Sequence, residues 1–252
     1  MLRFSFLLTF LFSLALNAQN NNAVGVGEKL VYTASYNMSG IMTNLAEVTM
    51  ETDAVKTSKA TLLRLKCTAF TYSKWDSFFK IRDLYETYVN PKTLKPYLHN
   101  RDINEGGYYK NMKYTFSHKT NTVKSVQTKK NNHVENKTIS IAPDTKDIIS
   151  TLYGIRTFDL RNLSPGTSKV FSILFDRTEE KGKVTYLGKE TISTPLGKKA
   201  CYKLSIGSAS SNTLNGTLWL TADENKIPVL VKFKIPVGSG ELKIKSVSGL
   251  KH

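Results

Sequence analysis

The chain has 252 residues, of which 40% are hydrophobic and 22% charged, proportions of a folded globular protein rather than a disordered or fibrous one. Its formal net charge of +16 attracts anionic partners through long-range Coulomb forces. An equally good explanation of this charge is a soluble cationic surface that has no dedicated partner. The length permits one large or two small domains, and we find no linker that would divide the chain.

Residues 1–18 have the pattern of a secretory signal peptide. Arg3 supplies a positive charge, residues 4–16 are mostly apolar, and Ala18 is the small residue expected before a cleavage site. The apolar run is shorter than the roughly 20 residues that span a bilayer. We therefore expect an exported protein without a transmembrane anchor, located in the periplasm of a Gram-negative bacterium, with residues 19–252 as a single β-rich domain.

Most of the remaining chain alternates apolar and polar residues with the period of two that is typical of half-buried strands. Turn-forming residues such as those at 90–93 and 238–240 separate these runs. The sheet is therefore predicted to be mainly antiparallel. The predicted strands cover residues 30–36, 46–50, 61–70, 78–89, 108–116, 170–175, 183–192, 201–206, 217–221, 228–237 and 241–247.

One segment, residues 144–156, has helical rather than strand periodicity. Asp144 and Asp147 suit a helix N-terminus. Ile148, Ile149, Leu152 and Ile155 then recur at helical spacing on one stripe. Because a sheet must bury one face and an amphipathic helix must bury its stripe, we expect this helix to cover the concave side of a curved sheet.

The two cysteines, Cys67 and Cys201, would be exposed to an oxidising compartment if the chain is exported. Cys67 shares a strand face with Leu63 and Leu65, whereas Cys201 alternates with the apolar residues of its own strand. The two thiols are thus expected on different kinds of face. The pattern argues mildly against a disulfide bond.

No motif for catalysis, a metal or a cofactor is present in the sequence. The histidines and cysteines lack the spacing of a metal site, and there is no nucleophile elbow, phosphate-binding loop or dinucleotide motif. We predict no cofactor, no metal and no enzyme activity.

The densest polar cluster lies between residues 76 and 109, where arginine and carboxylate side chains stand among many aromatic ones. Cross-strand ion pairs are the simplest interpretation, but aromatic density also suits a ligand groove, and Glu105 has acid or base chemistry if it is desolvated. The candidate ligand-binding residues are Arg82, Asp83, Arg101, Glu105, Tyr108 and Trp219.

Several short segments form a recognisable pattern through their order and spacing: residues 27–32, 82–91, 94–96, 101, 105–108, 147–156, 194–197, 201, 218–220, 223 and 227–229. Together they resemble the bacterial exported family called domain of unknown function 3108. The resemblance implies an envelope protein of Gram-negative bacteria with no established activity. The ending of the chain is also similar to lipoprotein-carrier half-barrels of the LolA/LolB type, in which a curved antiparallel sheet covered by helices holds acyl chains.

These observations predict a mainly β fold: one curved antiparallel sheet or incomplete β-barrel with a short helix on its concave side. Such a sheet can leave an apolar groove inside. The leading hypothesis is a non-enzymatic binder or carrier of a lipid-like, hydrophobic or anionic envelope component, with nucleic acid not expected as a partner. The oligomeric state is open.

Two other functions fit the same sequence. The first is a structural or scaffolding module that binds an envelope protein or an acidic glycan. The second is a glycan-acting enzyme that uses the carboxylates between residues 83 and 105. An open apolar pocket between sheet and helix would favour the carrier, whereas a filled interior would favour the scaffold.

Overall fold

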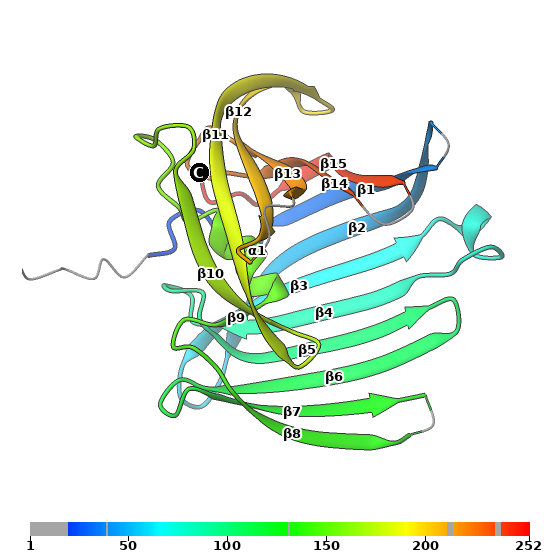
Figure 1. The fold of residues 1–252 in the computed structure, drawn as a ribbon, viewed down its shortest axis with the longest axis vertical. Coiled ribbons are helices and arrows are strands. Elements are labelled where there is room, and N and C mark those ends of the chain that lie inside the picture. Colours follow the sequence, from blue (N-terminus) through cyan, green and yellow to red (C-terminus); the bar gives the residue numbers. More distant parts are fainter. Residues whose placement is uncertain (1–19, 39, 131, 211–213, 235–237) are drawn as a thin grey trace, which may run out of the picture.

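The computed structural model describes residues 20–38, 40–130, 132–210, 214–234 and 238–252. The predicted signal peptide, residues 1–18, lies outside the described residues. Within these ranges the chain forms fifteen strands in one sheet and one α-helix, α1 (Ile148–Ile155) (Figure 1). The predicted fold class, a mainly β curved sheet with one short helix, is confirmed.

The sheet is a meander in which strands that follow each other along the chain also pair with each other, apart from the β8 to β9 step. Its two halves join where β1 pairs with β15. The first half consists of β1 (Lys29–Met38), β2 (Ile41–Lys56), β3 (Thr61–Thr71), β4 (Arg82–Val89), β5 (Pro96–Glu105), β6 (Tyr108–Ser117), β7 (Thr122–Lys129) and β8 (Val134–Ser140).

The second half runs from β15 back to β9, which pairs in parallel with β10, whereas all other strand pairs are antiparallel. Its edge strand β9 does not pair with the other edge strand β8, so the sheet stays open. The second half consists of β9 (Lys146–Asp147), β10 (Ser168–Phe175), β11 (Thr178–Thr194), β12 (Gly197–Ser208), β13 (Leu214–Thr221), β14 (Pro228–Lys234) and β15 (Ser239–Ser248).

The second half of the sheet folds over the first, with β10 and β11 running across the direction of β3–β6 (Figure 1). The β10–β11 turn reaches the inner face of the first half, where the backbone N–H of Arg177 donates to the hydroxyl of Tyr114 at 2.8 Å. Leu174 packs there in a buried apolar cluster with Met112 and Val123. Side-chain contacts thus connect the two halves where strand pairing does not.

Helix α1 begins later than the sequence predicted. Its N-cap is Asp147, whose Oδ1 accepts hydrogen bonds from the backbone N–H groups of Ile149 (2.9 Å) and Ser150 (3.0 Å). The predicted start at Asp144 is wrong, because Asp144 is exposed and pairs with Lys95 at 2.8 Å. The two residues before the helix form β9 instead, so pairing with β10 overrides helix formation there.

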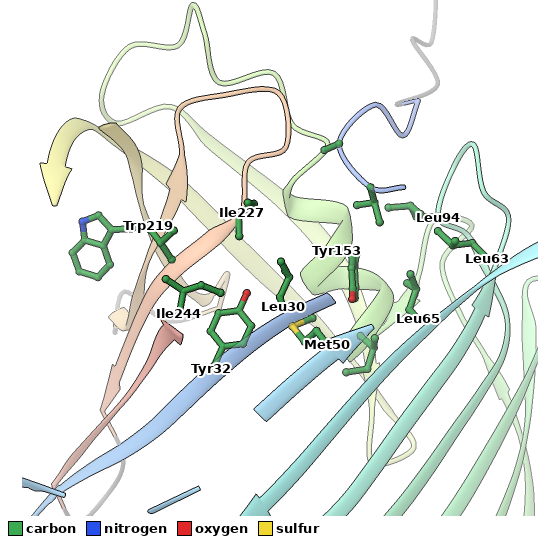
Figure 2. Close-up of a cluster of buried hydrophobic side chains, with 14 of the residues drawn as sticks. Leu30, Tyr32, Met50, Leu63, Leu65, Leu94, Tyr153, Trp219, Ile227 and Ile244 are labelled. Atoms are coloured by element: carbon green, nitrogen blue, oxygen red, sulfur yellow. The ribbon is translucent and has the colours of Figure 1, made fainter. Parts of the chain in front are cut away.

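The buried face of α1 fills the space over the first half of the sheet. Tyr153, which is fully buried, extends toward the strands that carry Met50 and Leu65 (Figure 2). Ile149 is buried in the same cluster. The predicted stripe is wrong at Leu152, which is 39% exposed, because α1 is only eight residues long and turns that side away from the sheet.

Four strands were not predicted: β5, β7, β8 and the two-residue β9, which lies in the segment predicted as helix. The inner faces of β5 and β7 carry polar side chains, such as His99, Ser125 and Gln127, that are nonetheless buried. The alternation of apolar and polar residues is therefore weak in these strands. The strand predicted at 78–89 begins only at Arg82, and Phe78 lies in the preceding loop with 84% of its surface exposed.

The two cysteines are free, as the strand pattern indicated. Cys201 is buried, and Cys67 is partly buried against the main apolar cluster. Burial raises the pKa of the Cys67 thiol to about 12 and that of the Cys201 thiol to about 11. Both groups therefore act as small apolar side chains rather than as nucleophiles.

Candidate functional site

The sequence predicted a groove between the helix and the sheet. In the structure, side chains fill the space between α1 and the first half of the sheet. Leu63, Leu65 and Leu94 are nearly inaccessible to solvent and pack in one cluster with Ile149 and Tyr153 of α1 (Figure 2). The predicted location of the ligand space is therefore wrong.

Three of the six predicted site residues, Asp83, Arg101 and Glu105, lie on neighbouring strands near the connection between β5 and β6. Asp83 is buried and accepts a hydrogen bond from the backbone N–H of Asn104 at 3.0 Å. Burial raises the pKa of Asp83 to about 7, the Asn104 bond opposes this, and the nearby Glu105 carboxylate adds to it. This carboxyl group is thus partly protonated near neutral pH.

Arg101 is held by the β10–β11 turn. Its Nη1 lies 2.5 Å from the Oδ1 of Asp176, and its guanidinium lies 4.5 Å from the ring centre of Phe175. The same Asp176 oxygen accepts a bond from Lys110 at 2.8 Å. Arg101 therefore already has an internal anionic partner, which comes from the β10–β11 turn rather than from a neighbouring strand of the cluster.

The other three predicted residues lie elsewhere. Arg82 pairs with Asp76 in the loop before β4, and Tyr108 is 57% exposed at the start of β6. Trp219, on β13, donates its indole N–H to Glu190 and lies at the edge of the main cluster, away from α1 (Figure 2). The structure does not bring the six together, and a ligand-binding role for them stays a prediction.

A hollow with a volume of about 660 Å³ lies beside the segment that follows α1. Its floor is apolar and includes Leu160, Val184, Tyr186 and Leu204, all of them buried. It is open to solvent on one side. The whole lining is Asn20, Asn22, Ala23, Thr157, Phe158, Asp159, Leu160, Arg161, Leu163, Thr167, Ser168, Lys169, Val184, Tyr186, Leu204 and Lys226.

Three cationic side chains stand at the rim of this hollow. The ammonium group of Lys169 lies 4.2 Å from the ring centre of Phe158. Arg161 binds Asp159 through two hydrogen bonds of 2.9 and 3.0 Å. Burial lowers the pKa of both Lys169 and Lys226. An anionic group bound at the rim would offset this cost of burial.

Sequence reasoning missed this hollow entirely. Its lining comes from residues 20–23, 157–169, 184–186, 204 and 226, so no local motif marks it. The local signal is a short run between α1 and β10, residues 157–163, which mixes three aromatic or leucine side chains with charged ones. A second, smaller hollow of about 400 Å³ lies beside Met42, Lys232 and Phe233.

In the described ranges, no three His, Cys, Asp or Glu side chains group closely enough to hold a metal ion. No helix among the described residues combines the length and apolar character that crossing a membrane requires.

Residues 31–245 match the sequence profile of a family described as "Protein of unknown function (DUF3108)". The chain belongs to the DUF3108 family. The match confirms the resemblance found in the short segments and extends through both halves of the sheet. In a comparison with curated proteins, nothing matches the chain.

Solved structures show what fold this DUF3108 chain is similar to. A beta-barrel-like protein of the domain of unknown function DUF1849 from Brucella abortus has a TM-score of 0.56 at 6% identity, over 88% of this chain and 97% of that one. This similarity concerns the fold alone.

Two further structures are more distant. A protein with a YmcC-like fold from Bacteroides fragilis has a TM-score of 0.30 at 8% identity, over 89% of this chain and 97% of that one. A DUF1329 family protein from Desulfovibrio piger has a TM-score of 0.25 at 9% identity, over 87% of this chain and 84% of that one. Both are too distant to inform the fold.

Proposed function

We propose that this protein binds a small amphiphile, with an apolar tail and an anionic group, in the hollow beside the segment after α1, and that it does so without catalysing a reaction. The observation that carries the proposal is the combination of an apolar floor, which includes Leu160 and Leu204, with the cationic side chains of Lys169 and Lys226 at the rim. Arg161, also in the lining, is bound by Asp159. An amphiphile satisfies both parts at once.

The size of the hollow limits the ligand. Sites for small molecules and cofactors commonly measure about 300–1,000 Å³, and the hollow of about 660 Å³ falls within that range. It therefore accommodates one small ligand. In the exported protein that the sequence predicts, the ligand would be an envelope component, and the protein a carrier or sensor for it.

A fluorescent fatty acid titrated into the purified protein tests the proposal. Lys169→Glu should weaken binding about tenfold or more, because it replaces a charge-assisted contact with repulsion. Leu163→Trp should reduce binding further by occupying the hollow with a larger side chain. The control is Lys124→Glu, which reverses an exposed charge on β7 outside the hollow and should bind like wild type.

Two results would contradict the binding proposal. One is the absence of binding by the wild-type protein. The other is equal binding by the wild type and all three variants, which would place the probe outside the hollow.

The filled space beneath α1 supports a second candidate, a scaffolding module. The packing of Tyr153 against Met50 and Leu65 leaves no room for a guest at that position. If the protein is a scaffold, a pull-down should recover one stoichiometric protein partner. Solvent extraction of the purified protein should then yield no lipid. The glycan-acting enzyme gains no support, because neither hollow is lined by residues 83–105.

A further inference from the structure

Three neighbouring connections at one end of the first half of the sheet expose apolar side chains to solvent. They join β1 to β2, β3 to β4 and β5 to β6, on the right in Figure 1. Ile41 is 73% exposed, Phe78 84% and Tyr108 57%. We call these connections, with Ile41, Met42, Phe78, Phe79 and Tyr108, the apolar hairpin ends.

The β3–β4 connection is fixed to β2 by hydrogen bonds. The indole N–H of Trp75 donates to the carbonyl of Asn44 at 2.9 Å, and the N–H of Tyr72 donates to that of Leu45 at 2.9 Å. Inside the connection, the N–H of Phe78 donates to the carbonyl of Trp75 at 2.9 Å. The exposed Phe78 therefore projects from a folded loop.

The β3–β4 connection is also fixed to the β5–β6 connection. The N–H of Gly106 donates to the carbonyl of Lys80 at 2.8 Å. Phe79 lies so close to Gly106 that a Cβ there would be 2.6 Å from its ring. The three apolar hairpin ends therefore form one preformed surface. Because this surface is already ordered, binding does not have to order it first.

Basic side chains stand between these apolar ones. Lys74 and Lys80 are exposed on the β3–β4 connection, and Lys130 is exposed next to the β5–β6 connection, where its Nζ donates to the carbonyl of Gly107. The carboxylate of the same loop, Asp76, is already bound by Arg82. A second carboxylate, that of Glu105, ends β5 at this end. Three lysines against this one remaining carboxylate leave a net positive charge for a partner.

We infer that the apolar hairpin ends dock on the surface of a lipid bilayer that contains anionic phospholipids. Aromatic side chains favour the interface between headgroups and acyl chains, and lysines at that depth are attracted by anionic headgroups. The apolar groups stand on separate projecting connections with lysines between them, a shape that fits a deformable headgroup layer. This inference is independent of the proposed ligand hollow, which involves none of these residues.

Cosedimentation of the protein with vesicles tests this inference. The vesicles contain phosphatidylcholine with phosphatidylglycerol, or phosphatidylcholine alone. Phe78→Ser should lower the vesicle affinity about tenfold or more, because one large apolar side chain no longer leaves water. Lys80→Glu should lower it at least about fivefold on the anionic vesicles.

Matched controls change similar side chains outside this surface. Val26→Ser replaces an apolar side chain that is 61% exposed just before β1, at the opposite end of that strand. Lys59→Glu reverses an exposed charge in the turn between β2 and β3, also at the opposite end. Both should sediment with the vesicles like wild type.

Three results would overturn the inference. The first is that the wild type does not sediment with phosphatidylglycerol vesicles. The second is that it binds them no more tightly than vesicles of phosphatidylcholine alone. Equal affinity of Phe78→Ser and Val26→Ser, or of Lys80→Glu and Lys59→Glu, would show that the apolar hairpin ends do not make the contact. A surface meant for a protein partner would give no vesicle binding.

Discussion

Glu28 and Arg156 form a fully buried ion pair that joins the start of β1 to the end of α1. Two hydrogen bonds of 2.6 Å connect the guanidinium to the carboxylate, and both residues are 1% exposed. Arg156 also donates to the carbonyl groups of Ala23 and Asn225. Glu28 and Arg156 belong to two of the short segments that carry the family resemblance, so these segments meet in the core.

Glu28→Gln should therefore destabilise the protein strongly. Removing one partner of a buried pair costs about 3–5 kcal/mol, because the other charge stays buried without compensation. Urea unfolding measures the change. The control is Glu51→Gln, which removes a half-exposed partner of Lys29 and Lys66 and should cost less than about 1 kcal/mol. Similar losses in the two variants would contradict the role assigned to the buried pair.

Asp147→Ala tests where α1 begins. The Asp147 carboxylate caps the helix and also accepts a bond from the hydroxyl of Thr87 at 2.8 Å, next to buried His99. Its loss should lower the free energy of unfolding by about 2–4 kcal/mol. Asp144→Ala should change it by no more than about 0.5 kcal/mol. A larger loss for Asp144→Ala would restore the helix start that the sequence predicted.

Asp83 should make stability depend on pH. Burial raises its pKa to about 7 in the folded protein, whereas an unfolded aspartate has a pKa of about 3.9. The folded state thus holds more protons between these values, so this contribution is fully present below about pH 4 and is lost as pH rises through about 7. Asp83→Asn can still accept the bond from Asn104.

The measurement is the free energy of unfolding of wild type and Asp83→Asn at about pH 5 and about pH 8. Wild type should lose more stability than the variant over this interval. Parallel losses would mean that Asp83 titrates normally and is not desolvated as the structure indicates.

The β10–β11 turn should hold the two halves of the sheet together through Asp176. Asp176 and Arg177 both have positive φ, 43° and 67°, a conformation that asparagine also tolerates. Asp176→Asn therefore keeps the backbone but removes the charge that faces Arg101 and Lys110. Because Asp176 is half exposed, we expect a loss of about 1–2 kcal/mol.

Hydrogen exchange of the same variant should also show faster exchange in β10 and β11. Asp53→Asn, which removes a surface partner of Arg64, serves as the control and should leave exchange in these strands unchanged. Unchanged exchange in Asp176→Asn would show that apolar contacts of Leu174 alone hold the turn.

The sequence predicted the architecture because most strands bury one apolar face. Residues such as Leu63 and Leu65 alternate with charged ones on β3, and this period of two is visible without coordinates. In β5 and β7, buried His99 and Ser125 occupy inner positions, and their polarity hides the strands. The start of α1 was missed because it depends on partners distant in sequence.

The candidate site was beyond prediction for a different reason. The charged cluster around Arg101 is conspicuous in the sequence. In the structure, however, Arg101 forms an ion pair with Asp176 from the other half of the sheet. The hollow has no conspicuous motif, since Leu160, Val184 and Leu204 each look like ordinary core residues. The pairing of β11 with β12 brings Val184 close to Leu204, and the segment after α1 adds Leu160 to the same cluster.

Photo-crosslinking with a diazirine fatty acid, followed by mass spectrometry of the labelled peptides, tests the central claim most directly. We predict labels in the segment 157–169 and around Val184 and Leu204, with competition by unlabelled fatty acid. Labels confined to residues 83–108, or labelling that competitor does not reduce, would contradict a ligand site in the hollow.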